Sequence, residues 1–227
     1  MNVGGLHNTL ELARKYNLRI FIPSSIAAFG PTTPLDNTPD VTIQRPTTVY
    51  GIGKVYCEHL GEYYNLKYGV DFRSLRYPGI ISSKTLPGGG TTDYAVDIYY
   101  YALRGQPYEC FLEENEELPM MYMPDCINST IELLEADPSK LTQRTYNVNA
   151  MNFSPKHIAE SIRKYIPGFK ITYKPDFRQN IAKTWPAKLD DTKARQDWNW
   201  KETFDLDKMT QDMLKELRKK LGPEAKF

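Results

Sequence analysis

Leu18-Arg-Ile-Phe-Ile-Pro-Ser-Ser25 is the stretch that decides the fold, because it is an apolar run closed by two small polar residues. Strands buried on both faces of a parallel sheet have this composition, and their carboxyl ends open into binding sites. An amphipathic helix precedes the run between residues 3 and 16, where apolar residues recur at three- to four-residue spacing. We therefore expect a helix that leads directly into a buried parallel strand.

The residues after this run predict a helix and a second buried strand. A loop rich in proline and threonine covers 30–46, a helix is expected over 47–68, and it stops before Gly69. The stretch 70–76 is read as a second buried strand, leading into Tyr77-Pro78-Gly79. Alternating helices and strands of this kind indicate an α/β fold.

Shorter elements follow and predict a smaller lobe on the sheet. A glycine-rich loop occupies 83–90, and the acidic stretch 113–117 is read as a solvated turn. The remaining apolar patterns predict helices over 92–103, 124–135, 155–166 and 204–221, and strands over 108–112, 119–123, 146–148 and 170–173.

Composition excludes several classes of function. Among the 227 residues, 29 Lys and Arg face 28 Asp and Glu, so no basic stripe for nucleic acid is indicated. Three cysteines without C-x-x-C spacing and three unpaired histidines predict reduced thiols and no metal site. No apolar run approaches the roughly 20 residues that span a bilayer, so no membrane partner is expected.

Tyr50-Gly-Ile-Gly-Lys54 is the motif that carries chemistry. Residues at i and i+4 lie on one face of a helix, so the phenol and the ammonium are neighbours. A nearby cation favours the phenolate and lowers a tyrosine pKa from about 10, which makes the phenol a usable general base. A hydroxyl at the carboxyl end of the strand, Ser24 or Ser25, is placed to hold a substrate alcohol.

The pair Tyr63 and Lys67 repeats the same spacing. Thirteen residues along a helix correspond to a rotation of roughly 220°, so the two pairs face different directions. We read Tyr63 as a packing or interface residue.

The motifs occur in the order of the extended short-chain dehydrogenase/reductase family, which this chain resembles. The resemblance is carried by Pro23-Ser-Ser-Ile-Ala-Ala-Phe-Gly30, then Tyr50-Gly-x-x-Lys54, then Arg76-Tyr-Pro-Gly79. Gly88-Gly-Gly-Thr-Thr-Asp-Tyr-Ala-Val-Asp97 and Ile181-Ala-x-x-Trp-Pro186 look like segments of the threonine-oxidising, NAD-dependent branch. The resemblance implies a partial Rossmann-like domain over 1–227, with a smaller α+β substrate lobe mainly from 83–123 and 149–190.

The resemblance also implies three sets of site residues. The catalytic set is Tyr50, Lys54, Ser25 and, as the second choice, Ser24. The set that binds the cofactor NAD is Tyr50, Lys54, Ile80, Tyr77, Pro78 and Asn2. The set that binds the substrate L-threonine is Ser25, Tyr50, Gly89, Thr91, Thr92 and Trp185.

Each implied role follows the family's reaction. Tyr50 removes the proton of the substrate hydroxyl, and Lys54 lowers the pKa of Tyr50 and binds the nicotinamide ribose. Ile80 lies against the nicotinamide amide, and Trp185 covers the amino-acid pocket. Hydride passes to NAD and leaves 2-amino-3-oxobutanoate.

One family feature is absent from the sequence. No G-x-G-x-x-G turn lies between a strand and a helix, although in the family such a turn precedes every motif seen here. We therefore expect a truncated chain that binds NAD poorly, has an apolar edge at 20–23, and shows little or no dehydrogenase activity by itself.

Three readings of function remain open at this stage. The chain belongs to a threonine dehydrogenase, to a sugar-nucleotide epimerase or dehydratase of the same family, or to a non-enzymatic subunit that regulates an intact partner. The family commonly pairs through two helices, here 3–16 and 47–68, so a homodimer is expected. The resemblance to animal-type members implies a mitochondrial location.

Overall fold

The main sheet is parallel and has β3 (Phe72–Tyr77) at its centre. The computed structural model describes the backbone of residues 2–227 and the side chains of residues 4–227. β1 (Ile20–Phe21) and β2 (Ser24–Ser25) pair one after the other with the same side of β3, and β7 (Thr145–Asn147) pairs with the other side. The predicted parallel sheet is confirmed. Within the stretch 18–25, Ile22 and Pro23 separate β1 from β2.

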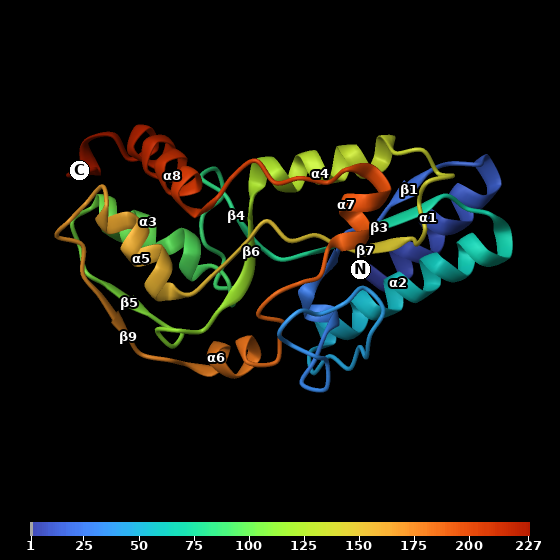
Figure 1. The fold of residues 1–227 in the computed structure, drawn as a ribbon, viewed down its shortest axis with the longest axis horizontal. Helices are drawn as coiled ribbons and strands as arrows, with labels where there is room; N and C mark the ends of the chain where they lie inside the picture. The colour runs from blue at the N-terminus through green and yellow to red at the C-terminus, as the bar shows by residue number, and fades with distance from the viewer. Residues whose placement is uncertain (1) are drawn as a thin grey trace.

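Two long helices cover one face of this sheet, at the right of Figure 1. α1 (Asn2–Tyr16) and α2 (Val49–Tyr68) bury an apolar cluster that includes Leu10 and Phe72. Thr48 caps the start of α2 by accepting a 3.0 Å hydrogen bond from the Gly51 amide, and Gly69 ends the helix at a φ of 71°. The predicted helices 3–16 and 47–68 are thus confirmed to within two residues.

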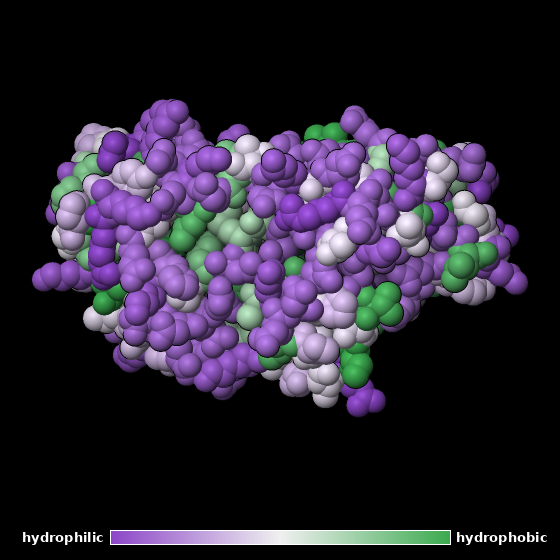
Figure 2. All heavy atoms as spheres, in the orientation of Figure 1, coloured by the Kyte–Doolittle hydropathy of each residue, from purple (hydrophilic) through white to green (hydrophobic). Residues whose placement is uncertain are grey.

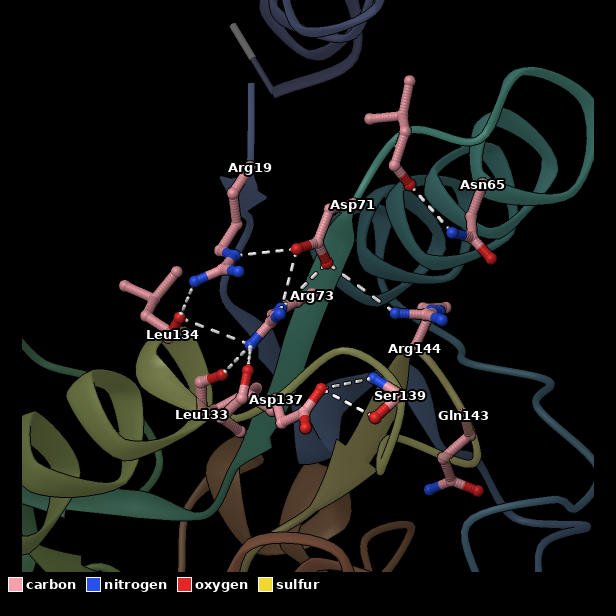
Figure 3. Close-up of polar contacts among 12 residues, drawn as sticks. Arg19, Asn65, Asp71, Arg73, Leu133, Leu134, Asp137, Ser139, Gln143 and Arg144 are labelled. Carbon is pink, nitrogen blue, oxygen red and sulfur yellow. Dashed lines mark hydrogen bonds and ion pairs between the residues drawn. The ribbon is translucent and has the colours of Figure 1, made fainter. Parts of the chain in front are cut away.

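The opposite face is covered by α4 (Met123–Glu135) and α7 (Thr192–Trp198). Arg73 is fully buried in β3 and donates hydrogen bonds to the last carbonyl groups of α4, among them a 2.8 Å bond to Ala136 O. Asp71 lies between Arg19 and Arg73, with charge-assisted bonds of 2.7 and 2.8 Å, as Figure 3 shows. This cluster ties β1, β3 and α4 together at the end of the sheet remote from Ser25.

A smaller lobe occupies the left of Figure 1. Its strands form a three-stranded sheet of β4 (Gly79–Ile81), β6 (Leu118–Tyr122) and β8 (Met151–Phe153), and a parallel pair of β5 (Tyr108–Cys110) and β9 (Ile171–Tyr173). Its helices are α3 (Tyr94–Leu103), α5 (Pro155–Arg163), α6 (Phe177–Ala182) and α8 (Leu206–Leu221). The largest apolar cluster lies among α3, α5 and α8.

Two short strands, β4 and β8, and two short α-helices, α6 and α7, were not predicted from the sequence. Each has three to seven residues, too few for an amphipathic period to be recognised or for a helix to be stable alone. Across residues 2–227, no helix is long and apolar enough to cross a membrane. The face in Figure 2 is mostly hydrophilic, with hydrophobic residues in a hollow near the junction of the main sheet and the smaller lobe.

Candidate active site

Tyr50 and Lys54 occupy the first two turns of α2, beside the end of the sheet. The Lys54 Nζ atom donates a 2.6 Å hydrogen bond to Pro23 O and lies 5.3 Å from the centroid of the Tyr50 ring. Tyr50 itself is 52% exposed, so its phenol is open to a small molecule. The ammonium group therefore lies beside the Tyr50 ring while bonded to the residue immediately before Ser24.

Close packing at Gly51 sets the position of Tyr50. A Cβ atom built on Gly51 would lie 2.1 Å from Ala27 O and 2.6 Å from Pro46 Cβ. Ala27 belongs to η1 (Ile26–Ala28), the short 3₁₀ helix that directly follows Ser25. Only a glycine allows the start of α2 to approach the backbone beyond Ser25 this closely.

The two serines differ in what their hydroxyl groups can do. Ser24 is 4% exposed, and its Oγ donates a hydrogen bond to Glu58 of α2. Ser25 is half-buried, and its Oγ accepts a 3.2 Å bond from the Ala27 amide, which leaves the hydroxyl proton free for another acceptor. The geometry favours Ser25 as the serine that contacts substrate.

The second tyrosine–lysine pair lies elsewhere on α2. Tyr63 follows Tyr50 by thirteen residues, or roughly 20 Å along the helix axis. Its ring packs edge-on against Tyr64 and Tyr68, with centroids 6.1 and 6.0 Å apart. Tyr63 is 49% exposed, so its surroundings are compatible with a packing or an interface residue.

The segment expected to face the nicotinamide lies next to one of the expected substrate residues. A Cβ atom on Gly79 would lie 2.7 Å from Thr92 Cγ2, so the turn after Tyr77 and the loop before α3 are in contact. The hydroxyl of Tyr77 pairs with Thr130 of α4, and burial raises the pKa of this phenol. Pro78 is buried and Ile80 is half-buried. The Asn2 side chain lies outside the described part of the chain.

The glycine-rich loop is held in a defined shape. The amides of Gly88 and Gly90 donate bonds of 2.6 and 2.9 Å to one oxygen of Asp93, and Gly89 between them has a φ of 90°. Gly89 borders a cavity of about 380 Å³ that Phe111 and Arg178 also line. This loop is therefore an ordered wall with a concave surface beside it.

The two remaining residues of the expected substrate set are at least partly buried. Thr91 is 8% exposed. Trp185 is half-buried and packs against two apolar clusters, the large one of the smaller lobe and one formed by Ile26, Phe29 and Leu189. Since Ile26 follows Ser25 directly, the indole lies between the lobe and the serine end of the sheet.

Two buried charged residues next to Ser24 were not predicted to belong to the site. Glu58 and Arg76 are 1% and 4% exposed and form an ion pair of 2.8 Å between α2 and β3. A signal was present in the sequence, because Glu58 lies one turn beyond Lys54 and Arg76 ends the stretch read as a buried strand. Charged residues at such positions are rarely buried without a partner.

Comparisons with known proteins identify the family of this chain. A family model described as "NAD dependent epimerase/dehydratase family" matches residues 1–149. The pig (Sus scrofa) protein "L-threonine 3-dehydrogenase, mitochondrial" is 53% identical over 215 residues, which are 94% of this chain and 58% of the pig protein. This chain thus spans little more than half the length of that relative.

Two solved structures extend the comparison. The L-threonine dehydrogenase from Phytophthora infestans is 60% identical, with a TM-score of 0.96 over 97% of this chain and 72% of its own. A monomeric L-threonine 3-dehydrogenase from a metagenome database is 46% identical, with a TM-score of 0.92 over 96% of this chain and 71% of its own. The Rossmann-like α/β architecture expected from the sequence is therefore confirmed.

Proposed function

The chain belongs to the NAD-dependent epimerase/dehydratase family, and from that premise we propose that it carries the catalytic and substrate-binding part of an L-threonine 3-dehydrogenase. The reaction oxidises the hydroxyl of L-threonine to a ketone. The observation that carries the proposal is Lys54, whose ammonium links the exposed Tyr50 ring to the end of the strand that holds both serines. The relatives described above support the choice of substrate.

Each residue of the site has a separate role in the oxidation of the alcohol. Ser25 donates its free hydroxyl proton to the substrate oxygen and orients it toward Tyr50. Tyr50 takes the proton of the substrate hydroxyl as a general base, and the Lys54 ammonium supplies a positive charge beside the Tyr50 ring. NAD supplies the hydride acceptor when bound.

The residues present fit the nicotinamide end of this cofactor. Lys54 is half-buried at the carboxyl ends of parallel strands, where nucleotides bind in open α/β sheets. Ile80 and the buried Gly79 supply an apolar wall beside Thr92. The assignment of Gly89, Thr91, Thr92 and Trp185 to the amino-acid pocket, and of 83–123 and 149–190 to a substrate lobe, belongs to the same proposal.

The substrate assay separates this proposal from the epimerase alternative. Because the sequence lacks a glycine-rich phosphate-binding turn, the assay uses a fusion of this chain to the part of the Phytophthora infestans protein that it does not match. We expect NADH to form with L-threonine and not with a UDP-sugar. Turnover of the UDP-sugar without turnover of L-threonine would contradict the proposal.

We further propose that two copies pair through α1 and α2. Ile52, Tyr56, Tyr63 and Leu66 are 40–86% exposed and lie within roughly 80° of one another around α2, at 100° per residue. Leu12 and Tyr16 of α1 are also more than half exposed. An apolar stripe of this size on a helix is typical of an interface.

Sedimentation measures whether this pairing occurs. Wild-type protein should sediment as a dimer, and Leu66→Glu should shift it to a monomer because the charge would be buried unpaired. A monomeric wild type, as in the metagenome relative, would contradict the pairing. A mitochondrial location, as in the name of the pig protein, is proposed with it and is tested by cell fractionation.

A further inference from the structure

Glu58 is the centre of a buried polar cluster, which we define as Glu58, Ser24, Arg76 and Gln44. The Glu58 carboxylate accepts bonds of 3.0 and 2.8 Å from Arg76, a 2.8 Å bond from Gln44 Nε2 and the bond from Ser24 Oγ. These partners come from β3, from the loop before α2 and from β2. One carboxylate of α2 therefore contacts three separate segments.

The bonds of Glu58 and Lys54 attach α2 to the strand end at two consecutive residues. Lys54 binds Pro23 O, and Glu58, one turn further along α2, binds the side chain of Ser24. Two attachments one turn apart fix both the rotation of the helix about its axis and its position along the axis. Tyr50 lies on the same helix one turn before Lys54, so its direction is fixed by the same two bonds.

The Ser24 bond also determines which serine faces the site. Successive side chains of a strand point to opposite faces, and in the parallel pairing Ser24 lies opposite Arg76 while Ser25 lies opposite Tyr77. Because Glu58 holds Ser24 on the buried face, Ser25 must point to the other face. A rotation of this strand end would exchange the two hydroxyl groups.

We propose that Glu58 is a positioning residue that orients Ser25 and Tyr50 by holding Ser24 inward and α2 in register with the strand end. This inference rests on the proposed oxidation of an alcohol at Tyr50. A stabilising role alone is a weaker account, because a buried ion pair often stabilises a protein no more than well-packed apolar residues would. The four bonds of the cluster fix the position of α2 relative to β2 and β3.

Hydrogen exchange of the chain itself tests the cluster without any turnover. Ser24→Ala removes only the serine bond and leaves the Glu58–Arg76 ion pair, so this variant should fold. We expect amide exchange over 23–28 to accelerate about 10-fold or more while exchange in α5 and α8 stays unchanged. Ser129→Ala, which removes a buried serine bond to Cys126 O in α4, is the matched control and should leave 23–28 unaffected. Unchanged exchange over 23–28 in Ser24→Ala would overturn the inference.

A double-mutant cycle on turnover separates positioning from general destabilisation. The cycle uses Glu58→Gln and Ser25→Ala, in the form of the protein that oxidises L-threonine in the assay above. We expect Glu58→Gln to lower kcat about 10-fold or more with KM nearly unchanged. Ser25→Ala should then cost about 10-fold or less, against about 100-fold in the wild type, because Ser25 is already misplaced.

The outcomes distinguish the two proposals. Additive losses from Glu58→Gln and Ser25→Ala would overturn the positioning role even if L-threonine is the substrate. If the wild type does not oxidise L-threonine, the proposed function fails, and the exchange measurement on Ser24→Ala still decides whether the cluster orders the strand end.

Discussion

Gly51→Ala is the substitution with the sharpest expected effect, because one added methyl group meets backbone that cannot yield. The new Cβ atom would lie 2.1 Å from Ala27 O, whereas ordinary van der Waals contact begins near 3.4 Å. Restoring that contact requires the start of α2 to withdraw by about 1.3 Å from η1, if the helix moves as a unit. Tyr50 would move with it, away from Ser25.

Two opposing contributions set the change in the free energy of unfolding of Gly51→Ala, and the displacement of Tyr50 sets the change in kcat. Overpacking costs about 1–3 kcal/mol, and replacing glycine by alanine inside a helix returns about 0.5–1 kcal/mol. The expected net loss of unfolding free energy is therefore at most about 2.5 kcal/mol, so the variant folds. A displacement of about 1 Å at a catalytic group lowers turnover by about 100-fold, and this is the expected loss in kcat.

Gly53→Ala provides the matched control. The position lies two residues further along α2, and a Cβ atom there would have no neighbour within 4 Å. This variant should gain about 0.4–1 kcal/mol in stability and keep its activity. Chemical denaturation and NADH formation with L-threonine measure both quantities. Wild-type turnover in Gly51→Ala, or equal losses in the two variants, would refute the argument that this close contact positions Tyr50.

Three further predictions follow from the same structure. Ser25→Ala should lower kcat/KM for L-threonine about 100-fold, while Ser24→Ala lowers it by about 10-fold or less; the reverse order would show that Ser24 contacts the substrate. Arg73→Met should lower the free energy of unfolding by about 3–5 kcal/mol, measured in urea, because Asp71 and the end of α4 lose a buried charged partner; a loss below about 1 kcal/mol would contradict this. Burial raises the pKa of Asp71, but hydrogen bonds from Arg73 and Arg19 outweigh it and hold the pKa below its usual range. The stability that Asp71 contributes is therefore present above about pH 4 and lost as the pH falls further, so wild-type protein should lose stability there more steeply than Asp71→Asn.

The long elements and the shared helix face of Tyr50 and Lys54 were predictable because their signals are local. The helix over 47–68 has a threonine cap and a glycine end, and the strand stretch 18–25 before it is an apolar run closed by two serines. The Tyr50–Lys54 pair needs only helical spacing. These features depend on residues a few positions apart, which the sequence displays directly.

Features that depend on distant contacts were not predictable. The inward position of the Ser24 hydroxyl depends on Glu58, 34 positions along the chain, and the position of Trp185 depends on its packing against the cluster of Ile26, Phe29 and Leu189. The short strands β4 and β8 exist because they pair with β6. Their few residues have no periodicity that separates a strand from a loop.

The central claim is that Tyr50, and not the second tyrosine of the same spacing, is the base that deprotonates the substrate alcohol. The most direct test compares Tyr50→Phe with Tyr63→Phe in the fusion described above, by NADH formation with L-threonine. Removal of a general base costs about 100- to 10,000-fold, so Tyr50→Phe should lose at least 100-fold in kcat while Tyr63→Phe keeps wild-type turnover. Equal activity of the two variants, or a larger loss in Tyr63→Phe, would contradict the account.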